Sequence, residues 1–290
     1  MIGAVSHNLA ENLASMAFFL ALAFTISWIA GLKHYFSLPH KTFKGPPVLL
    51  QDVFASFFIF IVVYFLVLPS IIATIIHKLP INHRPLYTIF GHLLTFSLTA
   101  LLLFLYTLLR DRSTMYRVWK DYSFPGSKTL ISDSKFGVIS WVIAMPIVAS
   151  VTYIAEIITS LITEPTNKEQ VAVKFLKDSL TDPLTSTIAF FSILIVAPLF
   201  EEYLFRGLLL SYFRTKLGSF GAIFTSALIF ALFHFSPSQS TENVTLLLTL
   251  FVFGCYLGFI YEKTRSLLSS IVLHVTFNSI SVIRIIFTHV

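Results

Sequence analysis

Two adjacent glutamates, Glu201 and Glu202, lie inside the otherwise apolar stretch 197–210, and Arg206 follows the second by four residues. A carboxylate within a long apolar run is costly to bury, so such groups usually face a polar cavity and have a function there. On an α-helix, Glu202 and Arg206 share a face and can form an ion pair. Glu201 points about 100° away and stays available as a base.

Two further stretches place polar side chains in apolar surroundings. His234 closes the run FALFH, and Phe230 lies one helical turn before it on the same face. His274 and Asn278 are four residues apart in LHVTFNSI, so they also share a face. Polar side chains on one turn of an apolar helix predict polar partners across a helix interface.

The composition predicts helices that lie in a membrane and position these residues. Of the 290 residues, 56% are hydrophobic and 12% are charged, and soluble domains carry roughly twice that charged fraction. The long apolar runs exceed strand length, which favours helices over barrel strands. We expect an all-α, polytopic transmembrane helix bundle with about eight spanning helices, at Ala14–Gly31, Val53–Ile76, Leu86–Leu109, Phe136–Ile162, Thr185–Leu210, Ser219–Phe235, Val244–Tyr261 and Leu267–Phe287.

The spacing around one glycine links the first two stretches. Gly218 lies in the turn between the fifth and sixth expected spans, with Glu201 17 residues before it and His234 16 residues after it. In an antiparallel helical hairpin, equal distances from the turn mean equal depth, here about 25 Å from the turn. Glu201 and His234 are therefore expected to meet across this hairpin.

The formal net charge of +6 indicates membrane orientation here, and no nucleic-acid motif accompanies it. Basic residues concentrate in the loops that follow the first, third, fifth and seventh spans. This asymmetry predicts cytoplasmic positions for those loops and places both termini outside. We expect an integral, multi-pass protein of the cell (inner) membrane.

The chain is expected to form one integrated membrane domain with two parts. Residues 1–165 would supply N-terminal membrane helices, and residues 166–290 the catalytic membrane helices that carry the three polar stretches. Between the fourth and fifth spans, Asn167–Leu180 is amphipathic and is expected to form a helix at the membrane interface.

The three stretches EEYLFRG, FALFH and HVTFN resemble the three-motif signature of the CPBP family. This family includes membrane proteins related to the type II CAAX prenyl endopeptidase and to bacteriocin-processing or self-immunity proteins. The resemblance covers roughly the last 110 residues, where the order and spacing of the motifs make it specific. The matching positions are Glu201, Glu202, Arg206, Phe230, His234, His274 and Asn278.

The resemblance implies an intramembrane endopeptidase that hydrolyses a peptide bond without a covalent intermediate. It assigns activation of a water molecule to Glu201 and His234, which requires a base that can take and return a proton. It assigns stabilisation of the oxyanion to His274 and Asn278 as N–H donors. Glu202, with Arg206 and Phe230 in support, would hold the neighbouring groups in place.

The chemistry of this site leaves a metal-dependent reaction open. No cofactor is expected, but Glu201, His234 and His274 could in principle bind zinc with an open fourth position, although the HExxH pattern is absent. Serine and aspartyl chemistry are disfavoured, because no GxSG stretch occurs and no Asp lies in the middle of an expected span.

The function itself admits two hypotheses besides proteolysis. The chain could be a non-catalytic membrane scaffold or a bacteriocin-immunity protein that binds a peptide. It could also be an ion-coupled transporter that uses Glu156, Glu201 and Glu202, although no inverted repeat is present. As an enzyme it would take a peptide or a membrane-protein segment as substrate, within the lipid bilayer. The sequence gives no indication of oligomeric state.

Overall fold

The computed structural model describes residues 2–38, 47–78, 80, 84–110, 118–121, 129–162, 171–180, 183–239 and 241–289. Within these residues every regular element is a helix, which confirms the expected all-α fold. Most elements are α-helices, and three are π-helical segments that continue a neighbouring α-helix. The elements are α1 (Ile2–Leu32), α2 (Leu50–Ile59), η1 (Phe60–Val67), α3 (Leu68–His77), α4 (Arg84–Leu109), α6 (Leu130–Ile162), α7 (Val171–Ser179), α8 (Pro183–Phe191), η3 (Ser192–Val196), α9 (Ala197–Glu201), η4 (Glu202–Leu210), α10 (Ser211–Phe233), α11 (Glu242–Thr264) and α12 (Leu267–His289).

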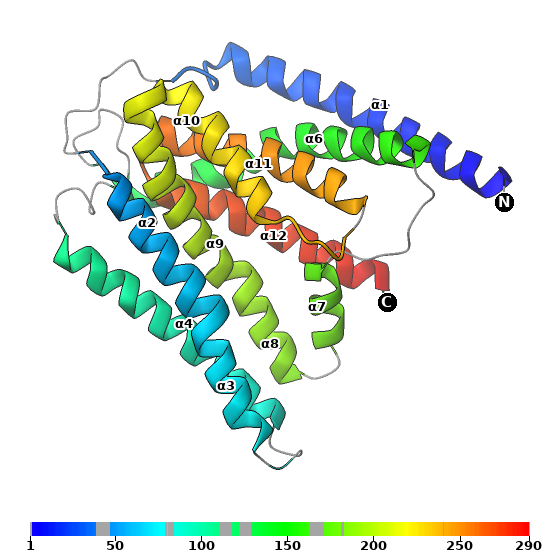
Figure 1. The fold of residues 1–290 in the computed structure, drawn as a ribbon. Helices are drawn as coiled ribbons and strands as arrows, with labels where there is room; N and C mark the ends of the chain where they lie inside the picture. Colours follow the sequence, from blue (N-terminus) through cyan, green and yellow to red (C-terminus); the bar gives the residue numbers. More distant parts are fainter. Residues whose placement is uncertain are drawn as a thin grey trace.

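Seven helical segments of the described chain are long and apolar enough to cross a membrane. The fifth, Pro183–Phe233, contains Gly218 with a φ of 70°, a backbone conformation that glycine adopts at little cost. At this turn the chain folds back, and α10 packs against η4 (Figure 1). The fifth segment therefore supplies both the fifth and the sixth expected spans. The chain is an integral, multi-pass membrane protein.

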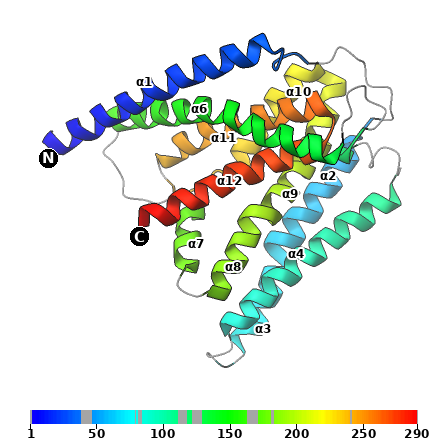
Figure 2. The same cartoon turned by 180° about the vertical axis from the view of Figure 1, so that it is seen from behind.

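The helices form two groups that cross at a steep angle. In both views α1, α6, α11 and α12 run alongside one another, whereas α2, α3, α4, α8 and α9 form the second group (Figures 1 and 2). Helix α1 packs mainly on α6, which also contacts α11 and α12. The segment η4 contacts elements of both groups, α2 on one side and α11 and α12 on the other.

The core of the molecule surrounds η4. All nine residues of this segment are buried, and Leu204, Phe205 and Leu208 have no exposed surface. By contrast, large apolar side chains on α1 are exposed, including Phe24 at 71%. Such exposure is costly in water and favourable in lipid, so α1 faces the acyl chains while η4 lies in the packed interior.

The amphipathic segment is helical in the part that the structure describes. Helix α7 covers Val171–Ser179, and Leu176 on its apolar face is buried. Residues 167–170 of the expected interfacial helix lie outside the described residues. The position of α7 at the membrane surface stays a prediction.

Candidate active site

The two glutamates lie where an α-helix changes to a π-helix. Pro198 lies inside the continuous helix formed by η3 and α9, where it has no N–H to donate to the preceding turn. Glu201 is the last residue of α9 and Glu202 is the first residue of η4. π-Helical segments alter the direction of side chains within a helix and occur often at functional sites.

The predicted ion pair between Glu202 and Arg206 is present and fully buried. Arg206 Nη1 donates to Glu202 Oε1 at 3.0 Å, and neither side chain has exposed surface. A second guanidinium nitrogen donates to the carbonyl oxygen of Gly254 at 3.3 Å. The guanidinium carbon lies 4.2 Å from the centre of the Phe230 ring, a favourable cation–π distance. Arg206 therefore connects η4 with α10 and α11.

Glu201 and His234 meet across the hairpin as their spacing from Gly218 predicts. Glu201 Oε1 lies 3.8 Å from His234 Nε2. The hairpin is fixed nearby by Ser226 Oγ, which donates to the carbonyl oxygen of Phe205 at 2.8 Å. Because this contact joins η4 to α10 close to the two side chains, it sets their relative depth.

A hydrogen bond to the backbone determines which ring nitrogen of His234 is available to react. His234 Nδ1 lies 2.8 Å from the carbonyl oxygen of Phe230. A carbonyl oxygen only accepts hydrogen bonds, so we infer that Nδ1 carries the hydrogen and donates it. In the neutral ring, Nε2 is then the lone-pair nitrogen, and it is this atom that faces Glu201.

His274 joins the two glutamates. Its Nδ1 donates to Glu202 Oε1 at 2.9 Å, and its Nε2 lies 3.7 Å from Glu201 Oε2. The ring packs edge-on against Phe253 with 5.4 Å between ring centroids. Glu201 therefore has one imidazole Nε2 beside each of its two carboxylate oxygens.

The side chains of this cluster become more exposed from Glu202 and His274 towards Glu201 and His234. Glu202 has no exposed side-chain surface and His274 has 6%, while Glu201 has 17% and His234 has 29%. The hydrogen-bonded groups are therefore covered, and the two groups expected to act on substrate are the accessible ones.

Asn278 occupies a different position from the other four predicted site residues. Its Nδ2 donates to the backbone carbonyl oxygen of Ile193 at 2.9 Å, which fastens α12 to η3. Among the described residues it makes no hydrogen bond to Glu201, Glu202 or the two histidines. The amide has a second N–H, so its assignment as an oxyanion donor stays a prediction.

The structure adds two neighbours that the sequence motifs do not contain. Tyr64 of η1 lies near enough to Glu201 to interact with it electrostatically, and its ring packs against Phe200 at 5.8 Å. Gly254 of α11 accepts the hydrogen bond from Arg206. Both residues come from long apolar runs in which no charge or spacing pattern singles them out.

Glu201, His234 and His274 carry the types of ligand that zinc binds. In the portion of the chain that the structure describes, however, no three or more His, Cys, Asp or Glu side chains are arranged to hold a metal ion. Each histidine is hydrogen-bonded through Nδ1, His234 to a backbone carbonyl and His274 to Glu202, so Nε2 is the nitrogen of each ring that remains available as a ligand. Among the described residues, these three side chains form no preformed zinc site.

Fold and site together define a polytopic membrane protein with a glutamate–histidine centre between its helices. Residues 183–280 match the family model described as type II CAAX prenyl endopeptidase Rce1-like. The matched region contains all the site residues predicted from the sequence motifs, and the match confirms the resemblance to the CPBP family. The match supports a protease. No curated protein and no solved structure matches the chain significantly.

Proposed function

We propose that the protein is an intramembrane endopeptidase in which Glu201 and His234 activate a water molecule for attack on a peptide bond. One observation carries the proposal: the Glu201 carboxylate lies between two imidazole Nε2 atoms, at 3.8 Å and 3.7 Å. These distances are longer than direct hydrogen bonds and leave room for a water molecule that bridges the groups. The family match supports the same reaction class.

In the proposed reaction, the role of each group follows from the hydrogen bonds that it already makes. The water oxygen attacks the peptide carbonyl carbon while Glu201, assisted by His234 Nε2, takes the water proton. The carbonyl oxygen becomes an oxyanion, the carbon–nitrogen bond then breaks, and the proton passes to the departing amine. His274 can donate to the oxyanion only when both ring nitrogens carry hydrogen, because its Nδ1–H is committed to Glu202.

The ion pair of Glu202 with Arg206 holds this arrangement. Glu202 Oε1 receives hydrogen bonds from both Arg206 and His274, so the histidine ring is oriented by a charge-assisted bond. The ring of His234 is oriented by its hydrogen bond to the Phe230 carbonyl oxygen. The proposed substrate is a peptide or a segment of a membrane protein.

A cleavage assay on candidate peptides in detergent tests the proposal. We expect Glu201→Ala and His234→Ala each to lower the cleavage rate by about 10²–10⁴-fold, the usual range for a lost general acid or base. Thermal unfolding of each variant in the same detergent verifies folding. If both folded variants cleaved as fast as the wild type, the reaction would use another site. If the folded wild type cleaved none of the peptides, the result would favour a peptide-binding scaffold.

A chelator decides the metal question separately. We propose a metal-free reaction, so activity should survive exhaustive treatment with a zinc chelator, with metal content measured on the same sample. Loss of activity that added zinc restores would replace the metal-free scheme with a zinc-dependent one.

A further inference from the structure

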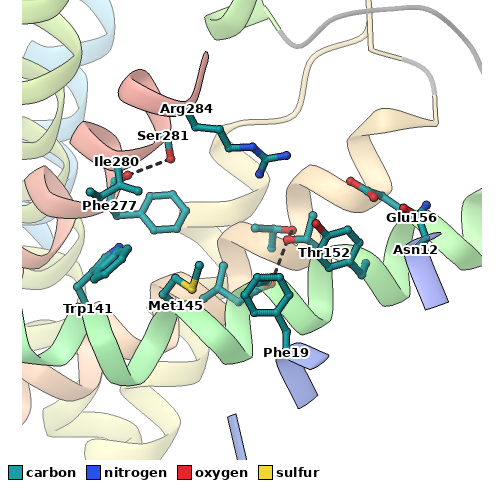
Figure 3. Close-up of a pocket in the computed structure, with 14 residues that line it drawn as sticks. Asn12, Phe19, Trp141, Met145, Thr152, Glu156, Phe277, Ile280, Ser281 and Arg284 are labelled. Atoms are coloured by element: carbon teal, nitrogen blue, oxygen red, sulfur yellow. Dashed lines mark hydrogen bonds between the residues drawn. The ribbon is translucent and has the colours of Figure 1, made fainter. Parts of the chain in front are cut away.

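A second polar region lies among the membrane helices, apart from the Glu201 centre. A cavity of about 370 Å³ opens between α1, α6, α11 and α12 (Figure 3). None of the predicted site residues lines it. Its nearest link to the site is Phe277, which lines the cavity and stacks on Phe253 at 4.2 Å.

The polarity of this cavity changes along its length. Trp141, Met145 and Phe277 gather at one end, and Glu156 and Asn12 lie at the other (Figure 3). Trp141 and Glu156 are 15 residues apart on α6, which corresponds to about 22 Å along the helix. The cavity therefore changes from apolar to polar over a distance comparable with one leaflet of a bilayer.

The polar end lies close to the ends of the spanning helices. Glu156 precedes the end of α6 by six residues, and Arg284 precedes the end of α12 by five. Asn12 lies four residues from the start of the first spanning segment at Leu9, counting both. The charged side chains are thus near the level of lipid headgroups, and the apolar end is deeper in the bilayer.

The two charged side chains face the cavity from different helices. Figure 3 shows no hydrogen bond between Glu156 and Arg284, whose interaction is Coulombic across the cavity. Among the described residues, no hydrogen bond or ion pair engages the Glu156 carboxylate. An ionisable group within a membrane span is costly and normally has a functional partner. Here a ligand can supply that partner.

We propose that this cavity binds a zwitterionic phospholipid of the ethanolamine type. Arg284 binds the phosphate, for which a guanidinium is suited, and Glu156 accepts hydrogen bonds from the primary ammonium. The first part of an acyl chain packs against Trp141, Met145 and Phe277. One acid and one base match a headgroup with no net charge, whereas an anionic lipid would leave Glu156 beside a negative charge. The volume suits a headgroup and part of one chain.

Native mass spectrometry of the full chain in detergent, with added phosphatidylethanolamine, phosphatidylcholine or phosphatidylglycerol, tests this proposal. We expect phosphatidylethanolamine to bind best, because choline offers no N–H donor to Glu156. Arg284→Gln should lower its binding by at least about tenfold, the value of one lost charge-assisted contact. Glu156→Gln should remove the preference for ethanolamine over choline while phosphate binding persists.

Two further variants keep the test decisive. Lys174→Gln removes one positive charge from the exposed surface of α7 and should leave lipid binding unchanged. Ala149→Leu narrows the cavity without a change in charge and should lower binding, so the proposal stays testable even if Arg284→Gln fails to fold. Equal phosphatidylethanolamine binding by wild type, Glu156→Gln and Ala149→Leu would overturn the proposal. Preferential binding of phosphatidylglycerol would do so as well.

Discussion

The two polar regions among the membrane helices differ in how their charges are satisfied. At the Glu201 centre, Glu202 is bonded to both Arg206 and His274. In the cavity between α1, α6, α11 and α12, Glu156 faces Arg284 without a hydrogen bond between the two. A connected network fixes its side chains and prepares them for chemistry. Separated charges around a cavity instead leave room for a ligand.

The difference follows from where each region lies in the fold. The segment η4 is buried along its whole length and packs against both helix groups, so Glu202 and Arg206 find their partners inside the protein. Glu202 Oε2 and Arg206 Nε are buried without a hydrogen-bond partner among the described residues. The cavity lies where α1 and α12 approach the lipid, and Arg284 is exposed. Substitutions at the two regions should therefore have unequal effects.

The largest effect on stability is expected from Arg206→Met. This change leaves Glu202 buried without its cation, and loss of one partner of a buried ion pair costs about 3–5 kcal/mol. The matched change Arg284→Met removes an exposed cation and should cost at most about 1 kcal/mol. Unfolding of both variants in the same detergent measures the difference. Equal losses would show that the Arg206 network contributes no special stability.

His274→Ala should affect the reaction more than the fold. Loss of a donor to the developing oxyanion lowers kcat by about 10²–10³-fold, and the hydrogen bond to Glu202 is lost as well. Peptide cleavage under saturating substrate measures kcat, with unfolding as the control for structure. An unchanged kcat would remove His274 from the proposed mechanism.

Gly254→Ala tests how closely α11 must approach the centre. A methyl group there would lie 3.1 Å from Ala227 Cβ and 3.2 Å from Phe230 Cδ1. Overpacking of this kind costs about 1–3 kcal/mol, and the Gly254 carbonyl would move away from Arg206. The free energy of unfolding measures the cost.

Gly31→Ala is the matched control, because nothing lies within 4 Å of the added methyl group. Alanine favours helix over glycine by up to about 1 kcal/mol, so this variant should be as stable as the wild type or slightly more so. If Gly31→Ala and Gly254→Ala lost equal stability, close packing at Gly254 would not be the cause.

Asn278→Ala should have a smaller effect on stability than Arg206→Met or Gly254→Ala. It removes one hydrogen bond to the Ile193 carbonyl, which is worth about 1 kcal/mol. The variant also tests whether Asn278 is an oxyanion donor. If kcat falls as far as in His274→Ala, Asn278 acts as an oxyanion donor. If kcat stays near the wild-type value, its role is to fasten α12 to η3.

Much of the helical framework could be predicted from the sequence, because membrane-spanning helices are recognisable as long apolar runs. The Gly218 turn also predicted which two residues meet, since residue spacing along a helix converts directly into depth. The ion pair of Glu202 with Arg206 followed from a spacing of four. These inferences need only local geometry.

The remaining features depend on how distant helices pack. No spacing rule predicts that His274 bonds Glu202 while it faces Glu201, because α12 is brought to η4 by tertiary contacts. The Asn278 contact with Ile193 depends on the position of η3. The surroundings of Glu156 cannot be predicted from the sequence, because only the packing of α1 and α12 beside α6 forms the cavity that it faces.

A double-mutant cycle on Glu201→Gln and His234→Ala, read out as kcat for one cleaved peptide, tests the central claim most directly. Groups that act together on one water molecule show strongly non-additive losses, so the double variant should be about as slow as the slower single variant. Losses in kcat that multiplied independently would contradict a shared water between the two side chains.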